Sequence, residues 1–181
     1  QHDCYGGTHR LLTSLAEQGL FELELFDLST QQGLERLRGT RADLVWVETP
    51  SNPLLRVVDI EAVAHAAGTA TVLVDNTFLS PALQNPLALG ADLVLHSTTK
   101  SINGHSDVVG GALVAKRAED AERVAWWANC LGLAQAPFDT YLILRGLRTL
   151  QARWALHEAN ARVLADRLAQ HPAVSQVWYH G

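Results

Sequence analysis

Lysine is scarce in this sequence, and one of the lysines lies where a primary amine could take part in a reaction. Among the 14 lysines and arginines, only Lys100 and Lys116 are lysines. Lys100 follows an apolar segment and two threonines, so its amine could be partly shielded from water and act as a nucleophile or a base, which arginine cannot do. Lys116 precedes Arg117, and we expect it to be a solvated surface charge. Taken by itself, Lys100 would also be interpreted as a solvated charge. A functional interpretation of Lys100 therefore depends on the residues around it.

Polar residues follow each of three apolar runs, and Lys100 ends one of these polar clusters. The clusters are residues 48–52, 75–77 and 96–100. Ligands of open α/β sheets bind outside the carboxyl ends of the strands, so we expect the clusters to meet in one crevice. Taken singly, each cluster could instead close a turn or cap a helix. Three clusters together with a lysine favour a binding site.

The side chains of these clusters match the groups that pyridoxal phosphate (PLP) requires of a protein. Lys100 could form an imine with the aldehyde of PLP, and Asp75 could keep the pyridine nitrogen protonated. Ser97 and Thr99 could donate hydrogen bonds to the phosphate. Two further residues are candidates for contacts with the ring: Asn52 for its phenolic oxygen and Tyr5 for its face. The candidate catalytic residues are therefore Lys100 and Tyr5, and the candidate cofactor-binding residues are Lys100, Asp75, Ser97, Thr99, Tyr5 and Asn52.

The elements that must position these side chains form an α/β unit. The apolar runs at 43–47, 70–74 and 92–95 are continuous, as expected of parallel strands that are covered on both faces. Residues 59–67 have helical spacing and end at Gly68, which predicts a βαβ unit. Residues 76–90 contain Pro81 and Pro86, so we expect an irregular crossover.

The rest of the chain is predicted to be mostly helical. We expect a helix over 7–18, strands over 21–26 and 110–115, and helices over 118–131, 138–147 and 149–170. Pro172 ends the last helix, and residues 174–178 would begin a new element, the first strand of a second domain. We therefore expect a large cofactor-binding domain over 1–170 and the start of a small domain over 171–181.

Five segments, taken in order, resemble the Cys/Met-metabolism family of PLP-dependent enzymes: residues 3–7, 48–53, 74–79, 96–100 and 103–111. The resemblance implies the large domain of the aspartate-aminotransferase-like fold (fold type I), with a mainly parallel sheet flanked by helices. It implies Lys100 as the Schiff-base lysine, Asp75 at the pyridine nitrogen, Ser97 and Thr99 at the phosphate, Tyr5 stacked on the ring and Asn52 near the ring hydroxyl. Ser101, where the family usually has an aromatic residue, and Gln135-Ala136 depart from the pattern.

Within the family, the resemblance implies γ-replacement, in which O-succinyl-L-homoserine or a related activated homoserine exchanges its acyl group for the thiol of cysteine. The alternatives are a γ-lyase or a homoserine sulfhydrylase of the same family, or a catalytically incomplete chain that serves as an interaction module. The family also implies a homo-oligomer, a dimer of dimers, in which a partner subunit and further segments complete the site.

Composition excludes several other classes of function. A net charge of -5 without a basic stripe disfavours nucleic acid as a partner, and no apolar run approaches the roughly 20 residues that span a membrane. The eight histidines lack paired ligand spacing, so we expect no metal site. The glycine pairs do not form a dinucleotide fingerprint.

The two cysteines, Cys4 and Cys130, have no metal-ligand or redox spacing, so we expect free thiols in a reducing cytoplasm. Because the sequence lacks methionine and ends on an apolar run, we expect it to be a fragment.

Overall fold

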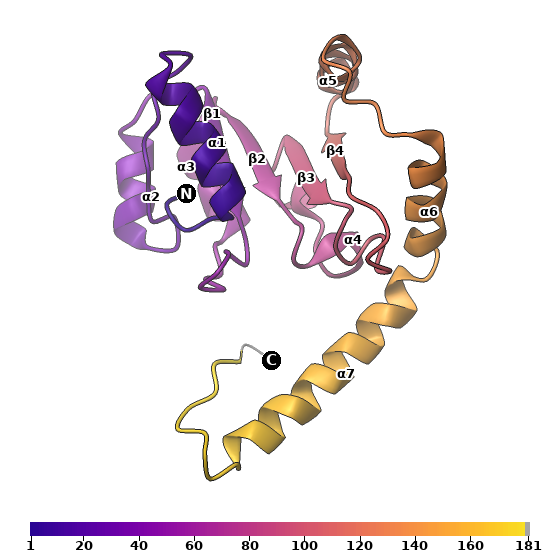
Figure 1. The fold of residues 1–181 in the computed structure, drawn as a ribbon. Helices are drawn as coiled ribbons and strands as arrows, with labels where there is room; N and C mark the ends of the chain where they lie inside the picture. Colours follow the sequence, from indigo (N-terminus) through magenta and orange to yellow (C-terminus); the bar gives the residue numbers. More distant parts are fainter. Residues whose placement is uncertain (180–181) are drawn as a thin grey trace.

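The computed structural model describes residues 1–179, and its centre is a 4-stranded sheet of order β1-β2-β3-β4. The strands are β1 (Leu44–Glu48), β2 (Thr71–Asp75), β3 (Leu93–Ser97) and β4 (Gly111–Ala115) (Figure 1). The first three strands are parallel, and β4 runs antiparallel to β3. The four predicted strands of this sheet are confirmed, and the direction of β4 is an addition.

Helix α3 (Ile60–Ala67) connects β1 to β2 and confirms the predicted βαβ unit. Asp59 caps the helix by accepting a hydrogen bond from Ala62 N at 3.0 Å, and Gly68, at φ 63, ends it. Val63 packs against Val47 and Val74 of the strands, and all three side chains are 0% exposed. The burial of one sheet face by this crossover holds β1 and β2 in register.

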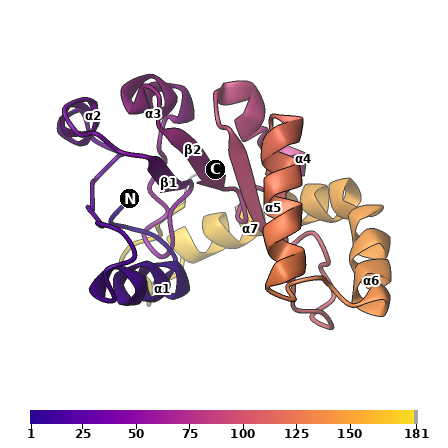
Figure 2. The same cartoon turned by 90° about the horizontal axis from the view of Figure 1, so that it is seen from above.

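Helix α2 (Gln31–Arg38) also covers this face, whereas α1 (Gly6–Glu17) lies on the opposite face (Figure 2). The sequence predicted α1, but it did not predict α2. The sequence signals for α2 are a threonine at the N-cap and two leucines at helical spacing. Thr30 accepts a hydrogen bond from Gly33 N at 3.1 Å, and Leu34 and Leu37 are buried.

The strand predicted over 21–26 is wrong, since this segment pairs with no strand in the described chain. His2 N donates to Phe26 O at 2.7 Å, and Phe26 enters the core. Phe21 and Leu25 are exposed. An apolar run becomes a strand only when a neighbouring edge accepts its hydrogen bonds, and no such edge lies beside residues 21–26.

The crossover from β2 to β3 is irregular, as predicted. It contains a short helix α4 (Ser80–Leu83) and a 3-10 turn η1 (Pro86–Leu89). Gly90 has a φ of 100 and lies so close to α3 that an added Cβ would be 2.9 Å from Ala64 Cβ. The close approach of η1 and α3 therefore requires glycine at this position.

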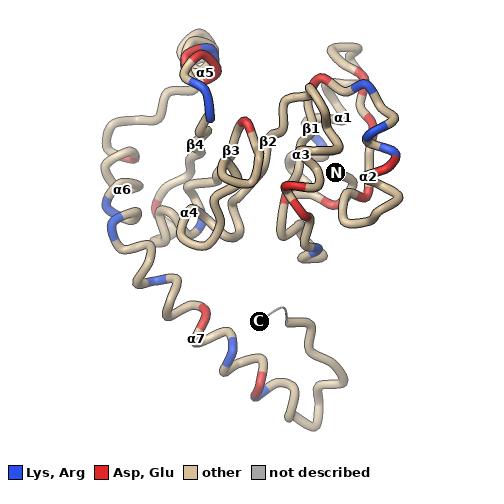
Figure 3. The backbone as a smooth tube through the Cα atoms, turned by 180° about the vertical axis from the view of Figure 1, so that it is seen from behind, with Lys and Arg blue, Asp and Glu red and all other residues tan. Residues whose placement is uncertain are grey.

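Three predicted helices follow β4: α5 (Ala118–Cys130), α6 (Pro137–Leu147) and α7 (Leu150–Ala169). Helix α7 extends away from the sheet (Figure 1), and charges of both signs are distributed along it (Figure 3). Only Leu150 among its residues is buried. Residues 174–178 form no strand, so that prediction is also wrong. No helix within residues 1–179 is long and apolar enough to cross a membrane.

Candidate functional site

The carboxyl ends of β1, β2 and β3 lie at one edge of the sheet, and the polar clusters that follow them meet there. Glu48 at the end of β1 pairs in register with Asp75 at the end of β2. Because β4 is antiparallel, it begins at this edge, where Gly111 pairs with Ser97. The loop that contains Lys100 connects β3 to β4 at the same edge. The three clusters therefore lie at one edge of the sheet, as predicted, and of the three only the third lines the depression described below.

Asp75 is 8% exposed and is held by hydrogen bonds on one of its two carboxylate oxygens. Asp75 Oδ1 accepts from the backbone N of Thr77 at 3.0 Å and from its hydroxyl at 2.6 Å. Thr77 Oγ1 in turn accepts from Ser97 N at 2.8 Å and so joins the ends of β2 and β3. Within the described residues, Asp75 Oδ2 has no hydrogen-bond partner and can accept from a ligand.

Glu48 is a buried carboxylate beside Asp75, and we did not assign it a function from the sequence. Its Oε2 accepts a hydrogen bond from Tyr5 N at 2.6 Å. The pKa of Glu48 is raised to about 7, mainly by burial and also by the nearby carboxylates of Asp75 and Asp3, while the hydrogen bond from the Tyr5 N–H acts in the opposite direction. The signal that could have identified Glu48 is an acidic residue at the end of a strand whose neighbour also ends in an acidic residue.

Tyr5 precedes the first turn of α1, and its side chain is 54% exposed. The ring lies against Gly7, where an added Cβ would be 2.5 Å from Tyr5 Cε1. Glycine at this position therefore leaves room for the ring. The hydrogen bond to Glu48 fixes the backbone of Tyr5 next to the end of β1, so the exposed ring face is available to a flat ligand.

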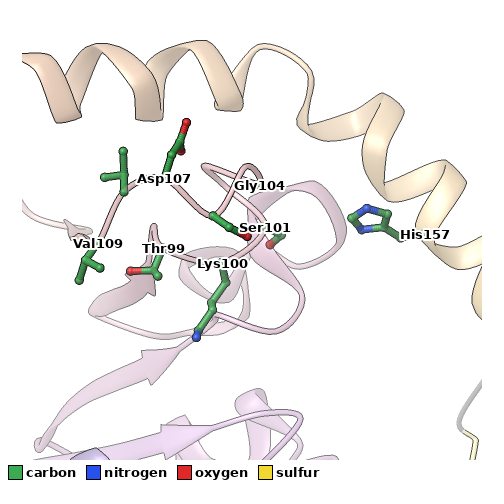
Figure 4. A pocket seen from close by; sticks show the side chains of 9 residues that line it. Thr99, Lys100, Ser101, Gly104, Asp107, Val109 and His157 are labelled. Carbon is green, nitrogen blue, oxygen red and sulfur yellow. The ribbon is translucent and has the colours of Figure 1, made fainter.

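Lys100 lies in an open depression of about 660 Å³ in the β3–β4 loop. The depression is also lined by Thr99, Ser101, Gly104, Ser106, Asp107, Val108, Val109 and His157. Figure 4 shows the Lys100 side chain directed away from Asp107 and His157. The amine is accessible, and the rest of the lining comes mainly from the residues that follow Lys100.

The two candidate phosphate ligands differ in their hydrogen bonds. Ser97 is half-buried, and its hydroxyl has no partner among residues 1–179. Thr99 Oγ1 accepts from Gly110 N at 3.0 Å and lies 3.2 Å from Gly110 O, to which its hydroxyl can donate. Thr98 Oγ1 is buried without a partner in the described chain. The hydroxyl of Ser97 is therefore free for a ligand, whereas that of Thr99 is committed to the loop.

Asn52 lies in the turn after β1 and is half-buried. Its side chain makes no hydrogen bond to another described residue. The turn itself is anchored, because Ser51 Oγ donates to the Asp3 carboxylate and accepts from Arg56 N at 3.0 Å. The structure thus brings Asp75, Ser97 and Lys100 to one edge, and it places Asn52 on a fixed turn without a contact that joins it to them.

His96 is 5% exposed and lies between Leu95 and Ser97 on β3. Desolvation lowers the pKa of His96, while the backbone of Asn76 and the charge of Asp75 act in the opposite direction. His96 Nδ1 is buried without a partner in the described chain. A neutral imidazole is expected at this position, and it supports the strand end without adding a charge to the site.

Comparisons with known proteins give a consistent result. The family described as "Cys/Met metabolism PLP-dependent enzyme" matches residues 1–181. The chain is 52% identical over 180 residues to cystathionine gamma-synthase of Escherichia coli, covering 98% of this chain and 47% of that protein. It is 47% identical over 182 residues to cystathionine gamma-lyase of Dictyostelium discoideum, covering 99% and 47%.

A crystal structure of cystathionine gamma synthase from Xanthomonas oryzae pv. oryzae, in complex with aminoacrylate and cysteine, has the same fold over this chain. The TM-score is 0.95 at 55% sequence identity, and the match covers 98% of this chain and 46% of that chain. The chain thus spans about half the length of the relatives that it matches.

Proposed function

Because the chain belongs to the Cys/Met-metabolism family of PLP-dependent enzymes, we propose that the complete protein, with any sequence that flanks these 181 residues, catalyses γ-replacement. The substrates would be O-succinyl-L-homoserine and L-cysteine, and the products L-cystathionine and succinate. The observation that carries this choice is the similarity to synthases, at 52% and 55% identity. The family and the α/β fold class predicted from the sequence are confirmed.

The residues at the sheet edge fit the cofactor of this family. PLP supplies an electron sink that takes up charge from the substrate carbons. Lys100 offers an accessible amine for its aldehyde, Asp75 offers Oδ2 for the pyridine nitrogen, and Ser97 offers a free hydroxyl for the phosphate. These roles, together with Thr99 at the phosphate, Tyr5 on the ring face and Asn52 near the ring hydroxyl, are part of the proposal.

The work of this chain is to hold the cofactor and to move protons. Lys100 Nζ would hold the cofactor through its aldehyde. As a free amine, Lys100 would accept and return protons at the α- and β-carbons of the substrate. Asp75 keeps a negative charge beside the pyridine nitrogen, and Thr77 fixes the orientation of that carboxylate. Tyr5 excludes water from one face of the ring.

A replacement of Lys100 tests this function in the complete protein. We expect Lys100→Ala to abolish the visible absorbance of the bound cofactor and nearly all formation of cystathionine from O-succinyl-L-homoserine and cysteine, because the other lysine, Lys116, follows the end of β4 at the opposite edge of the sheet. Lys116→Ala is the matched control and should retain wild-type turnover, since Lys116 is exposed beyond β4. Substantial activity of Lys100→Ala would refute the assignment.

A lyase is the second candidate, favoured by the 47% identity to the Dictyostelium enzyme. Incubation of the complete protein with cystathionine alone distinguishes the two reactions, because only a lyase would release cysteine at a rate comparable with synthesis. Borohydride reduction distinguishes both enzymes from an interaction module, since only an enzyme would carry the reduced cofactor on Lys100.

The domain division and the assembly state belong to the same proposal. The end of α7 at Ala169, followed by Pro172, supports a boundary near residue 170, with a small domain beginning at 171. The exposed aromatic side chains of α5 and α6 support a homo-oligomer. Cross-linking and light scattering of the complete protein measure its assembly.

A further inference from the structure

Arg153, near the start of α7, donates hydrogen bonds through all three of its guanidinium nitrogens. Arg153 Nη1 donates to Ser101 O at 2.6 Å, and Nη2 donates to Ile102 O at 3.2 Å. Nη2 also donates to Gly146 O at 2.7 Å, and Nε donates to Thr149 Oγ1 at 3.1 Å. All four acceptors are neutral oxygens, and Arg153 forms no ion pair within residues 1–179. The guanidinium is therefore used as a set of directed donors.

These acceptors belong to two segments that are far apart in the sequence. Ser101 and Ile102 are the two residues that directly follow Lys100, whereas Gly146 and Thr149 lie at the junction between α6 and α7. The Arg153 side chain thus fastens the loop after Lys100 to a helical junction about 50 residues away. A lysine could not replace it, because an ammonium lacks the planar arrangement of donors.

Two glycines show that the backbone is shaped to fit this contact. An added Cβ at Gly146 would lie 2.2 Å from Asn103 O and 2.7 Å from Ile102 O. Gly104 has a φ of 74, and a Cβ there would lie 2.1 Å from Arg153 Nη1. At Gly146 an added Cβ would overlap backbone atoms, so the end of α6 and the loop approach too closely for a larger residue, whereas at Gly104 the positive φ favours glycine and the guanidinium lies directly beside it.

The backbone of Lys100 depends on this fastened loop. Lys100 N donates to Ser97 O at 3.3 Å, which is long, and Lys100 O accepts from Gly104 N at 2.8 Å. Ile102 and Asn103, which follow in the same loop, are buried. Because the Lys100 side chain is exposed and has no hydrogen bond in the described chain, its position is determined by the backbone that bears it.

We propose that Arg153 is a positioning residue that sets the place of the Lys100 amine by holding the carbonyls of the two residues that follow it. The proposal rests on the proposed function of Lys100 as the cofactor-bearing amine. Arg153 does not touch the reacting atoms, so its replacement should displace the amine while the acid and hydroxyl groups of the site remain in place. A displacement of about 1 Å far from the chemistry can lower a rate by about a hundredfold.

The test uses two variants of the complete protein, Arg153→Lys and Arg153→Gln, and Arg162→Lys as the matched control. Arg162 lies on the same helix, is exposed and has no hydrogen bond within the described residues. We expect Arg153→Lys to lower kcat about tenfold or more, with KM nearly unchanged. We also expect a slower borohydride labelling of Lys100 and a shifted pH profile of the cofactor absorbance. Arg153→Gln should behave in the same way, and Arg162→Lys like the wild type.

A purely structural role would lower Tm and leave kcat, the labelling rate and the absorbance profile at their wild-type values, and that result would overturn the proposal. If neither Arg153 variant folds, Thr149→Val removes the acceptor of Arg153 Nε together with the hydrogen bond from Thr149 Oγ1 to Gly146 O, and it leaves the three acceptors of Nη1 and Nη2 in place. A drop in its kcat of about threefold would support the proposal, and an unchanged kcat and absorbance profile would refute it. Borohydride labelling of the wild type is measured first. If Lys100 of the wild type carries no cofactor, the proposed function is refuted. If the wild type is labelled and the Arg153 variants have the same kcat and labelling rate as the wild type, only the role of Arg153 is refuted.

Discussion

At the scale of single residues, the two carboxylates at the sheet edge have different environments. Asp75 accepts both of its hydrogen bonds from Thr77 on one oxygen, which leaves the other oxygen for a ligand. Glu48 is held by the backbone of Tyr5, and its pKa is raised to about 7. Asp75 is thus suited to accept a hydrogen bond from a ligand on Oδ2, and Glu48 is suited to hold a proton near neutral pH.

Replacement of Asp75 tests the need for its charge. In Asp75→Asn, the amide oxygen can keep the bonds from Thr77, which places an N–H donor where the carboxylate had an acceptor. We expect kcat to fall by about one to two decades, since a charge-assisted hydrogen bond contributes roughly 1.5–3 kcal/mol. Part of the cofactor should remain bound. Steady-state kinetics of the complete protein measure this effect, with Asp166→Asn on α7 as the control, and an unchanged kcat would rule out the electrostatic role of Asp75.

The raised pKa of Glu48 predicts a specific pH dependence of stability. A carboxyl group whose pKa is higher in the folded chain binds more protons there than in the unfolded chain, so its contribution to stability falls as pH rises. The fall begins near the ordinary pKa of 4.5 and is complete above about 7. In Glu48→Gln the amide can still accept the Tyr5 N–H, and this part of the pH dependence should disappear.

Urea denaturation of the cofactor-free protein between pH 5 and pH 8 measures this difference. We expect the free energy of unfolding of the wild type to fall relative to Glu48→Gln by about 1–2 kcal/mol, after allowance for screening by water at the sheet edge. Glu158→Gln on the exposed surface of α7 serves as the control and should run parallel to the wild type. Parallel curves for Glu48→Gln as well would contradict the raised pKa.

At the scale of elements, the site depends on how closely α6 approaches the loop after Lys100. Gly146 is buried in this contact, and a methyl group there would overlap the carbonyl of Asn103. We expect Gly146→Ala to lower the free energy of unfolding by about 1–3 kcal/mol, because overpacking forces the backbone apart. The same displacement should lower kcat, since the loop carries Lys100.

Gly39→Ala is the matched control for this prediction. Gly39 follows α2 with a φ of -84, and an added Cβ would have ordinary contact at 3.6 Å from Arg36 O. Its free energy of unfolding should stay within about 0.5 kcal/mol of the wild type. Thermal and urea unfolding of both variants measure the difference, and equal stabilities would show that α6 can move aside without cost.

At the scale of the whole molecule, much of the surface of the three C-terminal helices is apolar and exposed. Large side chains on α5 and α6 that are more than half exposed are Trp126, Trp127, Phe138, Tyr141 and Leu144. On α7, Leu156, Val163 and Leu164 are exposed to a similar degree. Surfaces of this kind usually contact another protein surface.

We therefore expect the 181-residue chain, expressed by itself, to self-associate and to lose PLP on dialysis. The depression at Lys100 is open, and Ser97 is the only candidate phosphate ligand with a free hydroxyl among the described residues. Absorbance after dialysis and light scattering measure the two effects. A monomeric chain that retains stoichiometric PLP and forms cystathionine would show that these residues suffice for the enzyme.

The sequence by itself determined the features that depend on neighbouring residues. Continuous apolar runs predicted the strands of the sheet, Asp59 and Gly68 marked the ends of α3, and the ordered motifs around Lys100 indicated the family. The predictions for 21–26 and 174–178 failed for one physical reason, because an apolar run has no strand structure until another edge accepts its hydrogen bonds.

Only the tertiary structure decided the contacts between segments that are distant in sequence. It placed Glu48 beside Asp75, bound the backbone of Tyr5 to Glu48, and brought Arg153 to the carbonyls after Lys100. No local pattern encodes these pairs, since each depends on the register of the sheet or on the approach of a helix to a loop. Burial is the main cause of the raised pKa of Glu48, with the charges of Asp75 and Asp3 acting in the same direction, and both are properties of the folded surroundings and not of the residue type.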